Sequence, residues 1–470
     1  MSKIEVDAIT QQSGTTLTVG GGACKTATVD ATTVTLGRSG GTVSLASGAT
    51  QSGFGRTGTV DWDTTPKTAT FSAVSGNGYF CNTTAGAFTV NLPAGSAGAI
   101  VSVQDYNNTF DTNNLTIDPN GSEKINGGDA GIALTLSTEG QGLTLVYIDA
   151  TVGWRSVHSD DFSQVPQTPA FITATGGTVL TVGNFKTHVF TGPGTFCVSC
   201  AGNSGGSNIV DYFVVAGGGG SASNAGGGGA GGFRVSNSVG CVAACVMSPL
   251  KNSTGLPVPV QGYSIVVGAG GSPAGTGCGA TANTPGGVST FSTITSAGGG
   301  RSKNASNPEG GPGGSGGGTY DGTTGAGNTP PVSPPQGNDS GAAGPGPSFI
   351  WTSGGGAGAA GSNANPPIGG AGSYIADTFV GPTAPSYGTP GPVSSTRYFA
   401  GGGGGANQGP TSGSTHAGGV GGGGTGASVD ASNNTAGGTN TGGGAGSGNG
   451  GSGIGRGGGS GIVMIRYKFQ

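Results

Sequence analysis

Charged residues are scarce in this sequence. Only 8% of its 470 residues are Asp, Glu, Lys or Arg, and the formal net charge is −4. The few lysines and arginines are scattered and form no basic patch, so we expect no nucleic-acid partner. Intrinsically disordered chains usually carry many charges. The low charge, together with apolar residues grouped in short blocks, therefore favours a folded chain.

Long apolar segments are also absent. No run approaches the roughly 20 residues that span a bilayer, and the opening residues MSKIEVDAIT lack the apolar core of a secretory signal. We therefore expect synthesis and assembly in a cytoplasm. This suits a virus particle component released by lysis, and it suits an ordinary cytosolic protein equally well.

The seven cysteines do not suggest a disulfide framework, because their number is odd and no secretory signal precedes them. Cys197 and Cys200 have the spacing of a redox or zinc motif. A redox pair needs a helix N-terminus, whereas this pair falls in a strand pattern. A zinc site would need Cys241 and Cys245 as two further ligands. We favour buried structural cysteines.

Patterns typical of enzymes are missing. The three histidines His158, His188 and His416 are far apart in the sequence, and no pair of carboxylates is marked out as a glycosidase would require. Residues 217–220 follow a predicted strand, as a dinucleotide-binding loop does, but more glycine and serine follow where that loop needs a helix. We predict that the protein is not an enzyme and has no cofactor, catalytic residue or metal.

Glycine, in contrast, contributes 109 residues and proline 26. Residues 1–58 repeat short runs of alternating Thr and Val or Leu, such as residues 16–19 and 42–45. Alternation gives such a strand one apolar and one hydroxyl face, and a strand this short does not bury its apolar face alone. We predict an intertwined shaft of three chains, with a single-chain solenoid as the alternative.

Residues 59–161 are expected to form a compact β domain. Residues 88–92 alternate apolar and polar side chains, and residues 143–148 form an almost continuous apolar run typical of a buried strand. No segment has a helical period. We predict a β-sandwich or jelly roll that Trp154 closes, followed by a linker over residues 162–170.

Residues 171–470 interleave predicted strands with glycine tracts, and the whole chain is predicted to be all-β. The last strand, at residues 462–467, is strongly apolar and should close a sheet that begins near residue 187. The tracts lack the Gly-X-Y repeat of collagen, so we predict polyproline II-like glycine helices that pair sideways. The alternative is flexible loops, because ordering glycine costs much backbone entropy.

Aromatic residues of the glycine-rich half lie in or beside these tracts. Rigid rings on small-residue loops bind sugars and protein surfaces at low entropy cost. Alternatively, the rings anchor loops onto the glycine layer. We expect Trp351 to be exposed, since it lies among Thr, Ser and Gly, and its truncation to weaken adsorption without changing assembly. The candidate receptor-binding residues are Tyr320, Phe349, Trp351, Tyr374, Phe379 and Tyr387, and Tyr398 belongs to the same group.

Several segments resemble tail-fibre proteins of marine bacteriophages. The resemblance to the start of these proteins is carried by residues 2–10 (SKIEVDAIT) and 13–20 (SGTTLTVG). A second resemblance, to their fibre β domain, lies in residues 83–93 (TTAGAFTVNLP), 113–117 (NNLTI) and 145–151 (LVYIDAT) with Gly153 and Trp154. A third resemblance, to their glycine-rich distal domain, lies in residues 211–217 (DYFVVAG) and 459–467 (GSGIVMIRY).

This resemblance implies a homotrimer in the phage virion. Its N-terminus would attach to phage tail, baseplate or adaptor proteins. Its C-terminal domain would recognise a bacterial surface glycan or outer-membrane protein and mediate adsorption to the host. Three other functions are compatible with the sequence: a non-adhesive head fibre or decoration protein, a polysaccharide depolymerase tailspike, and a bacterial surface or ice-binding protein.

Overall fold

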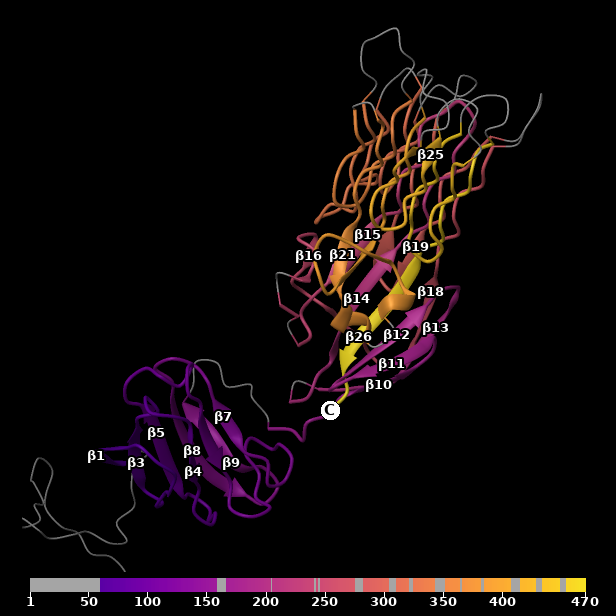
Figure 1. Cartoon of the computed structure of the whole chain (residues 1–470). Coiled ribbons are helices and arrows are strands. Elements are labelled where there is room, and N and C mark those ends of the chain that lie inside the picture. The colour runs from indigo at the N-terminus through magenta and orange to yellow at the C-terminus, as the bar shows by residue number, and fades with distance from the viewer. Residues whose placement is uncertain are drawn as a thin grey trace, which may run out of the picture. The chain divides into compact units, whose positions relative to one another are not determined.

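The structure is a computed structural model of the chain (Figure 1). It describes residues 60–158, 166–203, 205–240, 242–243, 246–274, 282–303, 310–320, 324–342, 351–363, 366–381, 384–406, 415–427, 433–448 and 454–470. The predicted shaft at residues 1–58 lies outside these residues, as do residues 162–165 of the predicted linker. The described chain consists almost entirely of strands and extended segments, which confirms the all-β prediction.

Residues 60–158 form two sheets. The first has the order β1-β3-β5-β8-β9, and its strands are β1 (Asp61–Lys67), β3 (Asn77–Cys81), β5 (Ile100–Asp105), β8 (Gly142–Asp149) and β9 (Gly153–His158). The second has the order β2-β4-β6-β7, with strands β2 (Phe71–Ser72), β4 (Phe88–Asn91), β6 (Leu115–Asp118) and β7 (Leu134–Leu136).

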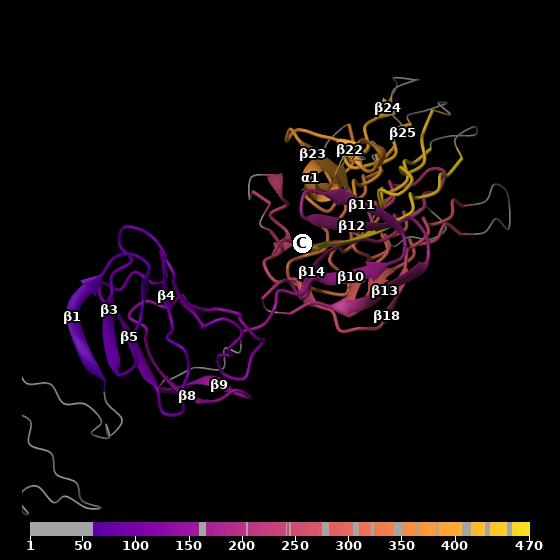
Figure 2. The ribbon, with the colours of Figure 1, turned by 90° about the horizontal axis from the view of Figure 1, so that it is seen from below.

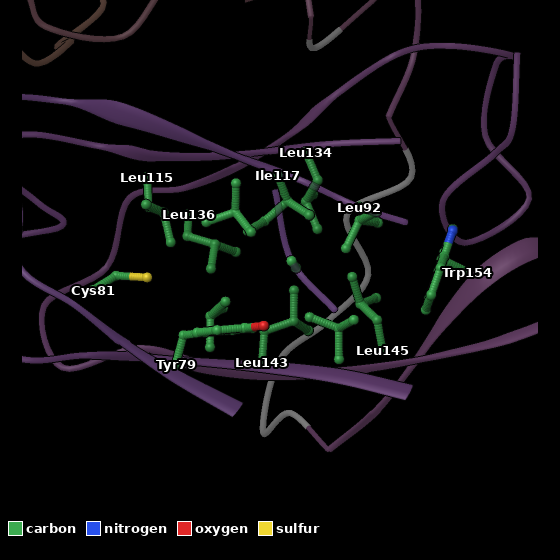
Figure 3. Close-up of a cluster of buried hydrophobic side chains, with 14 of the residues drawn as sticks. Tyr79, Cys81, Leu92, Leu115, Ile117, Leu134, Leu136, Leu143, Leu145 and Trp154 are labelled. Atoms are coloured by element: carbon green, nitrogen blue, oxygen red, sulfur yellow. The ribbon is translucent and has the colours of Figure 1, made fainter. Parts of the chain in front are cut away.

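The inner faces of these two sheets meet in one hydrophobic core, so the domain is a β-sandwich. Leu115 and Leu136 project from one sheet toward Tyr79 and Leu143 on the other (Figure 3). Alternation of buried and exposed residues along β7 and β8 produces these apolar faces. Trp154 is fully buried beside the same core, and its indole N–H donates to the Glu123 carboxylate (2.9 Å).

The second described domain, residues 166–470, also contains two large sheets. The seven-stranded sheet includes β11 (Thr178–Val182), β12 (Phe185–Phe190), β26 (Ile462–Lys468), β14 (Ile209–Val215), β15 (Phe233–Ser236) and β16 (Lys251–Asn252), and β17 (Leu256–Pro257) pairs with β14. The five-stranded sheet consists of β10 (Ile172–Thr175), β13 (Gly194–Ala201), β18 (Gly262–Val266), β19 (Ser289–Phe291) and β20 (Ile294–Ser296).

The last strand of the chain, β26, lies at the centre of the larger sheet. It pairs antiparallel with β12 on one side, where Arg466 faces Thr187, and with β14 on the other, where Ile465 faces Tyr212. This confirms the prediction that the C-terminal strand closes a sheet begun near residue 187. All residues from Ile462 to Tyr467 are buried because both faces of this strand are covered.

Each face of the larger sheet covers a separate apolar core. One core, which includes Phe196, Phe291 and Tyr467, lies toward the five-stranded sheet. The other includes Phe213 and Phe399 and lies toward a small substructure, which we call the side module (Figure 2). The side module consists of β21 (Ser373–Ala376), α1 (Asp377–Val380), the 3-10 turn Ala384–Ser386, β22 (Thr389–Pro390) and β23 (Thr396–Phe399).

Glycine-rich tracts continue from the strands of both sheets (Figure 1). In residues 217–221 every backbone N–H donates to another segment, and the partner segment repeats every three residues. Gly217 and Gly220 donate to the carbonyls of Gly287 and Thr284, which belong to one segment. Gly218 and Ser221 donate to the carbonyls of Gly459 and Arg456 on a second segment, and Gly219 donates to the carbonyl of Gly229 on a third. Three residues per turn without internal hydrogen bonds is the geometry of a polyproline II helix.

The carbonyl groups of the same tract follow the same repeat. They accept from Gly299 and Ser302, from Gly271 and Ala274, and from Ala445. Three segments thus accept hydrogen bonds from residues 217–221, and three other segments donate to these residues. These six segments surround the tract, as in a close-packed bundle. A Cβ built on Gly219 would overlap the Gly300 carbonyl, so this approach requires glycine. The predicted sideways pairing of glycine helices is confirmed for the described tracts, which we call the glycine lattice.

Among the described residues, no helix is long and apolar enough to cross a membrane.

Candidate functional site

The turn at Asn224 marks the end of the glycine lattice away from the sheets. Asn224 joins the tracts 217–221 and 226–232 and has a φ of +50°, a conformation that asparagine adopts more easily than most residues. Its N–H donates to the Gly448 carbonyl (2.9 Å), and Gly226 N–H donates to the Lys303 carbonyl (3.3 Å). Residues 303 and 448, each of which ends a described range, therefore lie at this turn.

Other described ranges end in the same place. Ala274 N–H donates to the Ser221 carbonyl (3.1 Å), Thr352 N–H donates to Thr319 (3.0 Å), and Gly227 N–H donates to Thr352 (3.0 Å). Trp351 N–H in turn donates to Ala406 (3.0 Å). We define the distal end of the lattice by the Asn224 turn and residues 274, 303, 320, 351, 406 and 448.

This arrangement follows from the up-and-down course of the chain. Neighbouring tracts run away from the sheets and back toward them, so the described ranges end together at one end of the lattice. Two short strands, β24 (Thr415–His416) and β25 (Gly426–Ala427), lie there as well (Figure 1). His416 is buried there, with its Nδ1 2.9 Å from the Gly405 carbonyl oxygen.

Among the described residues of the distal end, the exposed side chains are mainly polar and uncharged, with some aliphatic surface, while Arg456 is half-buried and Lys303 is buried. The exposed described residues include Asn224, Asn433, Thr415, Ile368 and Ile454. Amides and hydroxyls donate and accept hydrogen bonds with sugar hydroxyls and with exposed peptide groups. This end therefore suits a neutral polar partner better than a strongly charged one.

The expectation that Trp351 is exposed is wrong. Only 1% of its surface is accessible, and its ring stacks on the half-buried Tyr320 with centroids 6.1 Å apart. The Thr, Ser and Gly residues that follow it form a buried lattice tract at residues 352–357, which carries the indole into the packed structure. These two candidates thus lie together at the distal end, one buried and the other half-buried.

Three other candidates belong to the side module or to its edge. Phe379 is completely buried in the core between the side module and the larger sheet, which matches the anchoring alternative. Tyr387 packs partly buried against the same core. Tyr374 contacts Tyr398 across β21 and β23 with ring centroids 5.0 Å apart. Phe349 lies outside the described residues.

A buried ion pair, which the sequence did not suggest, holds the sheet that carries the lattice. The Asp211 carboxylate on β14 accepts hydrogen bonds from Ser236, Ser238 and the Val239 N–H (2.8–3.0 Å). Arg466 Nη1 on β26 lies 3.9 Å from this carboxylate and donates to the Val239 carbonyl (2.7 Å). Removing one partner of such a pair leaves an uncompensated buried charge.

His188 is a second buried polar group in this sheet. Its Nδ1 lies 2.7 Å from the Gly176 carbonyl, so Nδ1 carries the proton, and Nε2 accepts from the Tyr467 hydroxyl (3.0 Å). Burial lowers the pKa of His188, and the bond to Gly176 partly opposes this. The imidazole therefore has a structural role as a neutral group. Within the described part of the chain, no cluster of three or more His, Cys, Asp or Glu side chains could hold a metal ion.

Comparison with known families identifies the second domain. A family model described as "Glycine-rich domain" matches residues 189–468, which is more than half of the chain. The chain belongs to this glycine-rich domain family. The match begins near the end of β12 and ends with β26, so it covers the central strands β14 and β26 of the larger sheet and every described glycine tract. A search of curated proteins finds no significant match.

Proposed function

We propose that the chain is a tail-fibre protein of a bacteriophage virion, and that its glycine-rich domain adsorbs to the host surface through the distal end. The convergence of the lattice tracts at this end carries the proposal. Backbone hydrogen bonds hold the lattice, so the sequences that join its tracts can change without altering it. An adhesin that must follow a changing receptor needs this separation.

The partner we propose is a bacterial surface glycan or an outer-membrane protein. The uncharged amides, hydroxyls and aliphatic side chains of the distal end suit sugars and neutral loops. Small contacts of this kind bind weakly. Three copies in a homotrimer would raise the apparent affinity, because the second and third contacts form at a high effective concentration.

The N-terminal residues would connect the fibre to the particle. Residues 2–10 and 13–20 support this part of the proposal through their resemblance to the start of phage tail-fibre proteins. The connection would be made with tail, baseplate or adaptor proteins of the virion.

The test is binding of the fluorescently labelled full chain to a panel of whole bacterial cells. Ile368→Ser and Ile454→Ser change two distal side chains that are 44% and 43% exposed, and Val179→Ser on β11 is a matched control at 46%. Loss of one half-exposed aliphatic contact costs about 1 kcal/mol, which is about fivefold in affinity. We expect this loss from each distal variant and none from the control.

Three outcomes would contradict the proposal. Equal binding by all three variants and the wild type would show that the distal end is not the contact surface. Failure to bind any cell, combined with immunogold labelling of the particle head, would favour a decoration protein. Release of reducing ends from capsule polysaccharide would instead indicate a tailspike enzyme.

A further inference from the structure

The Cys197–Cys200 motif is placed unusually by a bulge in strand β13. Residues three apart on a regular strand point to opposite faces. Here Thr175 pairs with Cys197, Ala174 with Val198 and Thr173 with Cys200, so Ser199 is an extra residue. The bulge resets the alternation and puts both cysteines on the outer face, opposite two exposed threonines.

The burial pattern agrees with this assignment. Phe196 and Val198 are buried in the core between the sheets, whereas Cys197 and Cys200 are exposed, and both thiols are free. The expectation that these two cysteines are buried is therefore wrong, because the bulge turns both side chains to the outer face. The Ser199 hydroxyl donates to the Thr173 carbonyl (3.2 Å), which holds the extra residue against β10. The two thiols therefore share one face of a well-anchored strand.

The separation of the two cysteines decides what they can bind together. Their ladder partners Thr173 and Thr175 are two residues apart on β10, which corresponds to about 6.8 Å between Cα atoms. The Cα atoms of a disulfide are usually about 4.4–6.8 Å apart and most often about 5.5–6 Å apart, so this spacing lies at the upper limit. The sulfurs of a disulfide are only about 2.05 Å apart, whereas two sulfurs that share one ion through bonds of about 2.3 Å, the zinc–thiolate length, can be about 4.6 Å apart. A shared ion therefore suits the wider Cα spacing better than a disulfide does.

We propose that Cys197 and Cys200 form a two-thiolate site for a soft, thiophilic cation such as Cu(I). Thiolates select soft ions. The site offers two sulfurs on an uncharged face beside Thr173, Thr175 and Gly262, too few ligands for tetrahedral zinc. Each thiol releases one proton to water as its sulfur binds the ion, and no electron is transferred. Affinity therefore rises with pH.

The experiment titrates the full-length chain with Cu(I) under anaerobic conditions, against a chromophoric Cu(I) chelator. Cys197→Ser, Cys200→Ser and the double variant are compared with the wild type. An ion held by two sulfurs depends on both of them. Each single variant should therefore bind one equivalent of Cu(I) less tightly than the wild type does, and so should the double variant. The affinity of that equivalent should fall about 100-fold or more.

Two control variants separate this site from the buried thiol of Cys81 and from damage to the strand. Burial raises the pKa of the Cys81 thiol to about 12, so Cys81→Ser should leave Cu(I) binding unchanged. Ser199→Ala alters the same exposed bulge without removing a thiol and should keep the equivalent. Thermal unfolding of each variant checks that the fold is intact.

Three results would overturn the proposal. The double variant could bind as much Cu(I) as the wild type. Each single variant could retain half of the lost binding, as expected for two independent thiols. Finally, a Cys197–Cys200 disulfide formed in air and found by mass spectrometry would contradict the spacing argument.

Discussion

Replacing Gly219 by alanine tests the close packing of the glycine lattice directly. A Cβ at this position overlaps the carbonyl carbon and oxygen of Gly300. That oxygen accepts the hydrogen bond from Gly229 N–H (2.8 Å). The obstacle is backbone rather than a flexible side chain, so the added methyl group must push the tract at residues 298–303 away from residues 217–221.

The magnitude follows from three contributions. Overpacking a well-packed interior costs about 1–3 kcal/mol, and weakening the bond between Gly229 and Gly300 costs about 1 kcal/mol. Alanine also restricts the unfolded chain, which offsets about 0.4–1 kcal/mol. The expected net loss in the free energy of unfolding is about 2 kcal/mol. For a domain of this size the midpoint of thermal unfolding should fall by about 4 °C.

The control for this prediction is Gly192→Ala in the turn between β12 and β13. A Cβ there meets no atom within 4 Å, so its effect should stay within about 0.5 kcal/mol. Urea and thermal unfolding, followed by circular dichroism and fluorescence, compare both variants with the wild type. If Gly219→Ala were as stable as Gly192→Ala, the tracts could not be packed backbone against backbone, and the lattice argument would fail.

Two further predictions concern buried side chains. Because burial lowers the pKa of His188, the unfolded chain binds a proton more readily than the folded one below the usual histidine pKa of about 6.5. The free energy of unfolding should therefore decline as pH falls from 7 to 5.5, and this decline should be smaller in His188→Gln. Urea unfolding at each pH measures both. The same pH profile in the variant and the wild type would contradict this role of His188. Trp351→Ala should cost about 3–5 kcal/mol, with cell binding reduced only as far as the folded fraction is reduced; a loss of binding at full stability would restore a contact role for this residue.

The sheets could be predicted from the sequence because their patterns are local. Alternation at residues 88–92 and the apolar run at residues 462–467 correspond to β4 and β26. The partner of each glycine tract could not be predicted in this way. Successive glycines are chemically identical, so nothing in residues 217–220 says which segment each N–H will meet. The register of the flanking strands decides it, and that register is a property of the whole fold.

The same limitation explains the errors at the aromatic candidates. Tracts rich in Gly, Ser and Thr have the composition of loops, so we expected Trp351 to be exposed and included Phe379 among the contact candidates, although both are buried. Alanines within the lattice were equally ambiguous. Ala230 and Ala357 belong to the core beside the side module, where a methyl group fills space, whereas the neighbouring glycines meet backbone. Composition alone does not separate these two environments.

The stability of the lattice comes from its backbone hydrogen bonds and buried side chains, whereas its exposed distal side chains contribute little to that stability. Its hydrogen bonds join mainly backbone groups, and most of its apolar anchors lie at the sheet end, where β14 and β26 are buried on both faces. Trp351 is an additional buried anchor at the distal end. Substitutions of exposed distal side chains such as Ile368 and Ile454 remove neither a backbone hydrogen bond of the lattice nor one of its buried anchors. A surface built in this way can accumulate changes at little cost to folding, because most exposed substitutions alter stability by less than about 0.5 kcal/mol. This is the property that the proposed adsorption function requires, and it follows from placing glycine, which contributes no side chain, at the positions that carry the structure.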